Sequence, residues 1–529
     1  MEKSSIYCLN KLPKQSMKTT TRIFINSLSS YVAIGASVII NIILVPFVIR
    51  YLGKELFGLV AVAQSLCFIV ALCGSGLGQA MGRYFALKHA EGDSSGFQAY
   101  YTNSVVITVG IILPFVSLIA ILLAYFAIPH LNVKPELITS VVQIFIFLSA
   151  YSLTQILASP YMAICATAQK FYIQHFCTVA GQIICMAFIL LVLPVKPTLL
   201  VYGVAYFLSG FVCLILIFVI SGRLFKYCRF SPQLVDKQKI LGIFSISSQV
   251  LLPVVSNSVY TYGNQLIVNI FLGAIYNTYL EVCLIWQRLV WTVLNTVGSV
   301  IAPQITTYQA KERWDLVAEG LCRVTKYSAL IGFPLSAFLM FIPGPILWLW
   351  LRQEFSISVS IMPWFSLSLI PLICQIPAAS ILIALGKYKL PSIAAPILAA
   401  INLMIVLICL GWYKLGLESI AISMFICTFI RYGLIQTWYA AKMCRCAQLK
   451  YIYVGYIKPL ITILPFTAVL LLSKYYITSW NLAIMIAVIL ICVLVYVPSC
   501  WFLGFDKWDR DLAVSHLVSI KNRLTKKIC

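Results

Sequence analysis

The sequence predicts an all-α polytopic membrane protein with about fourteen transmembrane helices. Of its 529 residues 61% are hydrophobic and only 10% are charged, and the mean hydropathy is +0.97. Soluble globular chains carry about 25% charged residues, so the composition excludes that class. Apolar runs of roughly 18 residues or more, each long enough to cross a hydrocarbon core, recur from Arg22 to Phe502. Because they are continuous and do not alternate with period two, they favour helices over a barrel.

The order of apolar runs and breakers sets the expected elements. The predicted spans are 22–50, 54–82, 99–127, 136–163, 171–193, 198–222, 241–272, 277–308, 321–343, 356–385, 390–412, 416–440, 456–477 and 480–503. They group into an N-terminal tail (1–21), a first six-helix lobe (22–222), a basic linker (223–240), a second six-helix lobe (241–440), a helix pair (441–503) and a basic tail (504–529).

The basic residues fix the expected orientation. Most of the 38 Lys and Arg residues fall in alternate loops, on the side that holds the N-terminus. Cytoplasmic loops carry this excess, so both termini are expected in the cytoplasm. The N-terminal tail has lysines but no short apolar core with a small-residue cleavage site, and is not expected to be a cleaved signal. The net charge of +23 is spread over many short loops, which indicates topology and no nucleic-acid partner.

The sequence offers no cofactor or metal site and no enzyme motif. Most of the 18 cysteines lie inside apolar runs, where cysteine acts as a small hydrophobic residue. The pair Cys444 and Cys446 has the wrong spacing for a zinc knuckle, and no histidine cluster accompanies it. No phosphate-binding glycine loop is found. We therefore expect no cofactor and no catalytic residues.

An internal repeat relates the two expected lobes. The stretch 41–66 joins two apolar runs through Leu52-Gly53, and a shorter version returns at Leu272-Gly273. Aligning these connectors superposes the first and second spans on the seventh and eighth. The two pairs cross in the same sense, which predicts a parallel pseudo-twofold repeat with a substrate site between the halves. Chance similarity of two apolar hairpins is the alternative.

The first hairpin also resembles a known family. Asn41, Pro46, Arg50, Leu52-Gly53 and Phe57-Gly58 are similar to the first hairpin of bacterial Wzx-type polysaccharide flippases, in the multidrug/oligosaccharidyl-lipid/polysaccharide exporter superfamily. The small-residue run 74–78, followed by Arg83-Tyr84-Phe85, resembles that family's second helix.

The resemblance implies a function and its partners. It implies an O-antigen or other surface-polysaccharide flippase in the bacterial inner membrane. Such a protein moves an undecaprenyl-diphosphate-linked oligosaccharide from the cytoplasmic to the periplasmic leaflet by alternating access, driven by an ion gradient in some relatives. The implied partners are this substrate, membrane lipids, a polysaccharide polymerase and a chain-length regulator. A cation-coupled multidrug exporter of the same superfamily is the first alternative, and a membrane polymerase or glycosyltransferase is the second.

Arg288 is the first candidate for contact with an anionic substrate. It lies well inside the eighth span, and Glu281 lies seven residues earlier on the same helical face. An ionisable residue inside a membrane is costly, so it is a functional candidate by default. We expect Arg288 to bind diphosphate or sugar and Glu281 to act in ion coupling. A purely structural Arg–carboxylate pair is the alternative.

The remaining candidates are polar residues of three other spans. In the seventh span, Asn257, Tyr260 and Asn264 have helical spacing that suits sugar hydroxyls, although amides also join helices in membranes. Asn41 and Arg50 are their counterparts in the first span, with Arg50 at the outer end. Arg431, in the twelfth span, is either a substrate contact or a side chain that reaches the inner headgroups.

Overall fold

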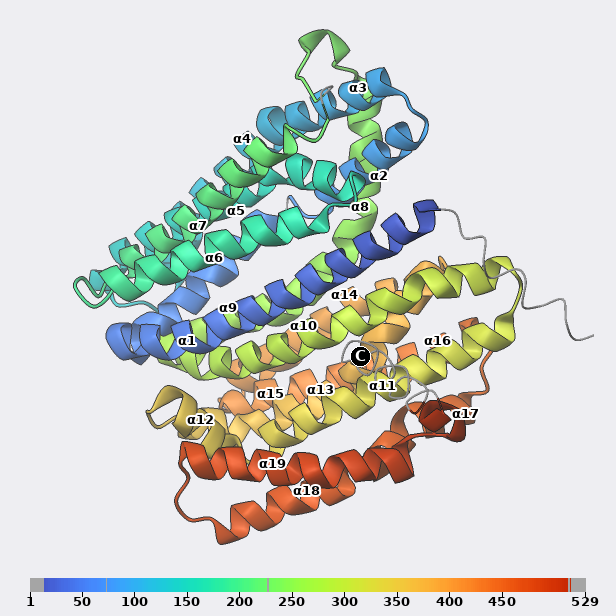
Figure 1. The fold of residues 1–529 in the computed structure, drawn as a ribbon. Coiled ribbons are helices and arrows are strands. Elements are labelled where there is room, and N and C mark those ends of the chain that lie inside the picture. The colour runs from blue at the N-terminus through green and yellow to red at the C-terminus, as the bar shows by residue number, and fades with distance from the viewer. Residues whose placement is uncertain (1–13, 73, 226–227, 512–513, 515–529) are drawn as a thin grey trace, which may run out of the picture. The chain divides into compact units, whose positions relative to one another are not determined.

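The computed structural model describes residues 14–72, 74–225, 228–511 and 514, and every element within them is helical (Figure 1). In the first half of the chain the elements are α1 (Lys14–Leu72), α2 (Leu77–Ala90), α3 (Ser94–Val105), η1 (Val106–Ile112), α4 (Leu113–Leu122), η2 (Leu123–Ala127), η3 (Ile128–His130), α5 (Pro135–Thr167), α6 (Phe171–Val192), α7 (Leu199–Ser221), η4 (Pro232–Leu234), α8 (Lys237–Ser258), η5 (Val259–Gly263) and α9 (Asn264–Leu272).

The second half continues without a strand among the described residues. Its elements are α10 (Ala274–Ala310), α11 (Trp314–Phe341), α12 (Pro343–Leu351), α13 (Ser356–Ala384), α14 (Lys389–Gly411), α15 (Leu417–Thr428), η6 (Phe429–Gln436), α16 (Thr437–Met443), α17 (Gln448–Ile452), η7 (Tyr453–Ile457), α18 (Lys458–Tyr476), α19 (Leu482–Ser499) and η8 (Cys500–Gly504). The prediction of an all-α membrane protein is confirmed.

Each predicted span coincides with a helix or with consecutive helical segments. Eleven stretches of the described residues are long and apolar enough to cross a membrane. The count of fourteen and the cytoplasmic termini remain predictions. The expected tails 1–21 and 504–529 fall largely outside the described residues, although α1 already begins at Lys14.

The second predicted span is not one continuous helix. The first three residues of the small-residue run, 74–76, form a turn before α2, and Gly76, which precedes α2, has φ of +85°. That left-handed conformation suits glycine, which has no Cβ to clash with the backbone. The apolar run alone could not show this interruption.

The helices form two compact units, residues 1–278 and 279–529. In the first unit α7 packs on α5 and α6, and α1 packs on α5, α6 and α9. In the second unit α11 packs on α13 and α18, and α18 lies beside α19 (Figure 1). The seventh predicted span, α8 to α9, belongs to the first unit because it contacts α1, α2 and α3. The predicted lobe boundaries at 222 and 241 remain a prediction.

Close helix contacts in the first unit depend on small residues. A Cβ at Gly203 of α7 would lie 3.0 Å from the Cβ of Phe147 on α5, and one at Gly210 would overlap the Thr154 hydroxyl. These glycines are seven residues apart and face the same helix. Lipid is as apolar as a leucine side chain, so helices in membranes gain stability through such close van der Waals packing.

The two Leu-Gly connectors share one unusual backbone conformation. Gly53, inside α1, has φ +79° and ψ 170°, and Gly273, between α9 and α10, has φ +94° and ψ 175°. This region of φ/ψ space is essentially restricted to glycine. The repeat inferred from the sequence therefore extends to the local geometry of both connectors.

The segments that follow the two connectors pack against each other within the first unit. The Thr278 hydroxyl donates a hydrogen bond to the Lys54 carbonyl, and any Cβ at Gly58 would collide with the Ala274 carbonyl. With Gly53 aligned on Gly273, Lys54 corresponds to Ala274 and Gly58 to Thr278. The Lys54 carbonyl thus meets Thr278, five residues after Gly273, and the Ala274 carbonyl meets Gly58, five residues after Gly53. A local twofold axis between the two connectors produces this reciprocal pattern.

Candidate functional site

Arg288 and Glu281, the predicted substrate and coupling residues, form an ion pair on α10, as in the structural alternative. The Arg288 guanidinium donates to the Glu281 carboxylate two turns earlier, because residues seven apart stack along one face of a helix. The Glu281 side chain is buried, at 7% exposure, whereas that of Arg288 is 43% exposed. The carboxylate therefore holds the cation in place, and part of the guanidinium stays accessible.

Residues beside Arg288 fix its helix against neighbouring elements of the second unit. Gln287 Nε2 donates to the Ser368 hydroxyl of α13 at 3.4 Å. The Trp286 ring meets the Trp350 ring of α12 edge to face, with centroids 5.3 Å apart. The sequence analysis did not single out Trp350, because α12 lies in a segment treated as part of a connection. Residues two apart on a helix do not face each other, so the Trp286–Trp350 contact fixes α10 and does not place either ring against the Arg288 side chain.

The polar residues of the seventh span do not form one uniform stripe. Asn257 is exposed, whereas Asn264 is buried and its Nδ2 donates to the Tyr260 carbonyl at 2.9 Å. Between them η5 is π-helical, which widens the turn and shifts the helical register. Residues spaced for an α-helical face are therefore displaced from one another.

Neighbouring amides of the same helix join it to other parts of the first unit. The Ser65 hydroxyl of α1 donates to the Gln265 side chain, and Asn269 Oδ1 accepts from the Asn132 backbone N–H at 3.1 Å. All three side chains are buried. Their contacts are those of buried polar groups that connect helices.

Asn41, Arg50 and Arg431 lie in three different environments. Asn41 is exposed, and its Nδ2 donates to the Ser37 carbonyl of its own helix at 2.8 Å. Arg50 is exposed at the end of the first predicted span. Arg431 is buried in the π-helix η6, with its guanidinium 4.7 Å from the centre of the Tyr432 ring. The roles of all three residues remain predictions, and for Arg431 both the substrate contact and the reach to the headgroups stay open.

A second charged cluster, which the sequence analysis missed, lies where the end of the chain meets α11. Lys326 of α11 is 1% exposed, and its Nζ donates to Asp509 at 2.5 Å and to Asp506 at 3.0 Å. Lys458 also donates to Asp506, and the Tyr327 hydroxyl donates to Asp509. We call these five residues the Lys326 cluster. Lys326 is separated from its carboxylates by 180 and 183 residues, so only the fold brings them together.

Both carboxyls of the Lys326 cluster are held in the charged form. Burial raises the pKa of Asp509, but hydrogen bonds from Lys326, Tyr327 and the Asp506 backbone outweigh it, and the pKa lies below its ordinary value. Burial likewise raises the pKa of Asp506, and hydrogen bonds from Lys458 and Lys326 bring the net pKa below its ordinary value. The cluster has the composition of a closed structural ion-pair network.

Within the described ranges no group of three or more His, Cys, Asp or Glu residues is arranged to hold a metal ion. We therefore consider the Arg288–Glu281 pair and the Lys326 cluster as an anion contact or as structural links.

Comparison with known proteins bears on both the fold and the family. A family model described as polysaccharide biosynthesis protein matches residues 23–309. The uncharacterized membrane protein EpsK of Bacillus subtilis (strain 168) is 21% identical over 424 residues, which cover 79% of this chain and 83% of that protein. These matches agree with the resemblance seen in the first hairpin.

Two kinds of solved structure share the fold. The lipid II flippase MurJ, in an inward closed conformation, has a TM-score of 0.67 at 16% identity over 93% of this chain and all of that chain. An inward-facing multidrug resistance MATE family transporter of the MOP superfamily has a TM-score of 0.61 at 13% identity, over 77% of this chain and 95% of the transporter. At such identities these likenesses concern the fold. The chain is thus a multi-pass membrane protein with the architecture of these transporters.

Proposed function

Because the chain belongs to the polysaccharide biosynthesis protein family, we propose that it is a flippase for a lipid-linked oligosaccharide. In this proposal an undecaprenyl-diphosphate-linked surface-polysaccharide unit passes from the cytoplasmic to the periplasmic leaflet. Alternating access of two lobes, driven by an ion gradient, moves it. A polysaccharide polymerase and a chain-length regulator would act on the product.

The observation that carries the proposal is the partly exposed side chain of Arg288 in α10, the helix that coincides with the predicted eighth span. Arg288 follows Ala274, the first residue of α10, by 14 positions, about 21 Å along a helix. A charge at that depth costs roughly 2.5–3.5 kcal/mol on insertion scales, and such residues face a cavity or a partner. A guanidinium that is partly accessible and partly held by Glu281 can accept a diphosphate through charge-assisted hydrogen bonds.

Glu281 has a distinct role in this mechanism. Its buried carboxylate orients Arg288 while no substrate is bound. When a diphosphate takes the guanidinium, the carboxylate loses its counter-charge and can pair with another cation. Proton or cation uptake at Glu281 would then accompany substrate binding, which is the coupling that an ion-driven flippase needs.

The test measures which leaflet holds the lipid-linked oligosaccharide in cells that carry variants of this protein. Arg288→Gln combined with Glu281→Gln removes both charges and leaves no lone buried carboxylate. We expect substrate to accumulate on the cytoplasmic side and surface polymer to be lost, with normal amounts of protein in the membrane. The exposed Arg352→Gln is the matched control and should retain transport. Normal surface polymer in the double variant would remove Arg288 from the mechanism.

Deletion of the gene separates this proposal from a polymerase. A flippase defect leaves the unpolymerised unit on the cytoplasmic side. If the unit accumulated on the periplasmic side instead, the protein would act after translocation and the flippase proposal would be wrong.

A multidrug exporter is the second candidate, and the fold shared with a MATE transporter favours it. A cationic drug needs a carboxylate without a competing cation, whereas Glu281 is paired with Arg288. Drug susceptibility of the deletion strain decides between the two. Increased susceptibility together with normal surface polymer would support export of drugs.

A further inference from the structure

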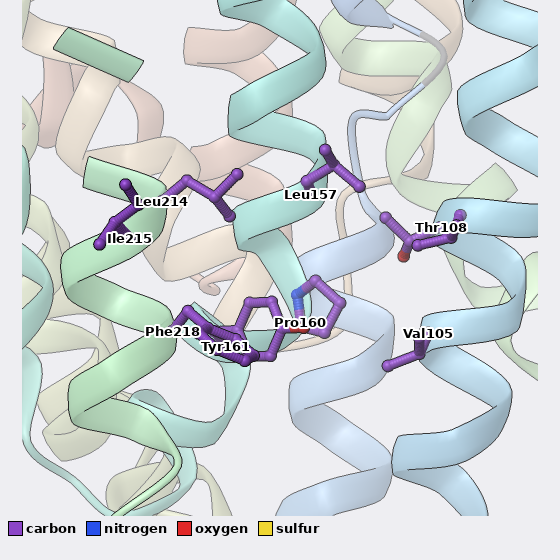
Figure 2. Close-up of a pocket in the computed structure, with 9 residues that line it drawn as sticks. Val105, Thr108, Leu157, Pro160, Tyr161, Leu214, Ile215 and Phe218 are labelled. Atoms are coloured by element: carbon purple, nitrogen blue, oxygen red, sulfur yellow. The ribbon is translucent and has the colours of Figure 1, made fainter. Parts of the chain in front are cut away.

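The first unit carries an apolar groove on its surface that the proposed function does not use. Its volume is about 300 Å³, and its lining is Val105, Thr108, Val109, Leu157, Pro160, Tyr161, Leu214, Ile215 and Phe218. Figure 2 shows the lining in three rows, with α5 in the middle, α7 on one side and α3 with η1 on the other. Val109, Ile215 and Phe218 are 44–54% exposed, so the groove opens at the protein surface.

Local helix chemistry gives the groove its shape. The π-helix η1 widens the chain on one wall, and Pro160 stands in the floor. The Phe218 ring packs edge to face on Tyr161, with centroids 5.1 Å apart, and closes one end. The walls come from three helices that pack together in one unit, so the groove is a fixed feature of that unit.

The two polar residues of the lining offer little to water. The Thr108 hydroxyl donates to the Ser104 carbonyl at 2.8 Å and leaves its methyl group to the groove. The Tyr161 hydroxyl is hydrogen-bonded to Tyr101. A cavity holds water only where two to four polar partners are available, so an apolar occupant is favoured here.

Cations gather at one end of the same three helices. Arg223 follows α7 five residues beyond Phe218, about 8 Å along a helix, and Lys170 follows α5. Arg229 is tied to α3, since its carbonyl accepts from Gln98 Nε2 at 3.2 Å. Arg223 and Arg229 are both exposed. By the positive-inside rule this end faces the cytoplasm.

The acidic residues at this end are engaged with other cations. Glu91 and Asp93 pair with Lys88 at 2.7 and 3.3 Å, and Asp236 pairs with Lys239 at 2.6 Å. The ends of the three lining helices therefore have positive charge available for a phosphate. Polybasic segments at the inner membrane surface attract anionic lipids with about 1 kcal/mol per cation.

We propose that this groove is a binding site for an anionic phospholipid of the inner leaflet. One acyl chain lies between η1, α5 and α7, and the phosphate lies beside Arg223 and Arg229. The site is separate from Arg288 in chemistry, since its ligand is a structural lipid and is not transported. A bound lipid here would tie α3, α5 and α7 of the first unit together at their cytoplasmic ends.

The experiment uses the full-length protein in phosphatidylcholine nanodiscs. The probe is phosphatidylglycerol with a photoreactive group in mid-chain, and labelled peptides are identified by mass spectrometry. We expect labelling within 105–109, 157–161 and 214–218. A phosphatidylcholine probe with the same chain should label these peptides at least about fivefold less. Equal labelling by both probes would overturn the proposal and indicate ordinary boundary lipid.

Variants test the groove and the cations separately. Leu157→Trp fills the groove and should abolish the labelling, whereas Ile183→Trp, at an exposed position of α6, should not. Each of Arg223→Gln and Arg229→Gln should weaken probe binding about fivefold, and Lys196→Gln, in the loop between α6 and α7, should have no effect. If Leu157→Trp fails to fold, Val109→Trp on the exposed wall replaces it.

A competition experiment identifies which lipid supplies the acyl chain in the groove. Excess unlabelled phosphatidylglycerol should displace the probe, and an equal amount of undecaprenyl phosphate should not. Displacement by undecaprenyl phosphate alone would assign the groove to the transported lipid and would overturn the proposal.

Discussion

Two cations on helices of the second unit, Arg288 and Lys326, differ in how far their ion pairs are enclosed. Arg288 is 43% exposed and is held by a carboxylate of its own helix, whereas Lys326 is 1% exposed and is held by carboxylates beyond α19. The first cation can bind a ligand through the exposed part of its side chain. The second can do so only if Asp506 and Asp509 leave. Enclosure, more than the presence of charge, therefore separates a candidate binding group from a structural one.

The comparison also bears on how the last helix pair, α18 and α19, is held in the second unit. The Lys326 cluster joins α11, α18 and the segment after η8. Arg323 adds to it by lying over the Trp508 ring, 3.5 Å from its centre. These charged contacts attach α18 and the segment after η8 to α11. We regard the cluster as an anchor and Arg288 as the transport residue.

The largest expected effect comes from removing the carboxylates of the anchor. Asp506→Asn with Asp509→Asn leaves Lys326 buried without a counter-charge, which costs about 3–5 kcal/mol for buried pairs. We expect a large fall in the thermal unfolding midpoint of the purified protein. If the midpoint were unchanged, the cluster would not anchor the C-terminal pair.

A second double variant, which lacks the enclosed charges of Lys326 and Asp509, tests the same interpretation. Lys326→Met with Asp509→Asn removes the enclosed cation together with one partner and leaves Asp506 paired with Lys458. Most of the lost stability should return, because a buried ion pair replaced by apolar or neutral groups is often close to neutral. Unfolding midpoints of the two double variants, measured side by side, provide the comparison.

Acid should weaken the anchor before it unfolds the rest of the chain. Both carboxyls have a pKa below the ordinary 3.8, so they bind fewer protons in the folded state than in the unfolded state. Their contribution is present above the ordinary pKa and is lost as the pH falls from about 4 through the lowered values. The unfolding midpoint between pH 6 and 3 should fall more steeply in the native protein than in Asp506→Asn with Asp509→Asn. Parallel curves would contradict the assignment.

Glu281→Gln should have a smaller effect on stability and a clear effect on transport. Arg288 is partly solvated, so loss of its partner costs about 1 kcal/mol, as for exposed pairs. Transport should lose its dependence on the ion gradient, because the carboxylate proposed for coupling is gone. Leaflet assays with and without an uncoupler measure this. Transport that remained gradient-dependent would exclude Glu281 from coupling.

The smallest effect is expected from Glu319→Gln. Glu319 pairs with Arg323 one turn later, and the two side chains are 47% and 27% exposed. Exposed pairs at this spacing contribute about 0.3–0.5 kcal/mol. A shift of the unfolding midpoint as large as that of the anchor variants would show that burial does not determine how much each ion pair contributes to stability.

Features that depend on neighbouring residues were predictable from the sequence. The continuous apolar runs determined the helices, because a chain in lipid must satisfy its backbone hydrogen bonds internally. The two Leu-Gly connectors determined the repeat, because only glycine adopts the backbone of Gly53 and Gly273. Glu281 and Arg288 were predicted to share one helix face because seven residues separate them, and their pairing was the alternative to a role in substrate binding and coupling.

Features that depend on distant residues were decided by the tertiary structure. The π-helix η5 shifted the register between Asn257 and Asn264, and no period in the sequence marks it. Lys326 contacts carboxylates some 180 residues away, and the residues that line the apolar groove come from α3, η1, α5 and α7. Sequence spacing fixes which side chains share a helix face, since helix geometry is local. Which face is enclosed and which stays open depends on the packing of whole helices, and that is why the anchor and the groove appeared only in the folded protein.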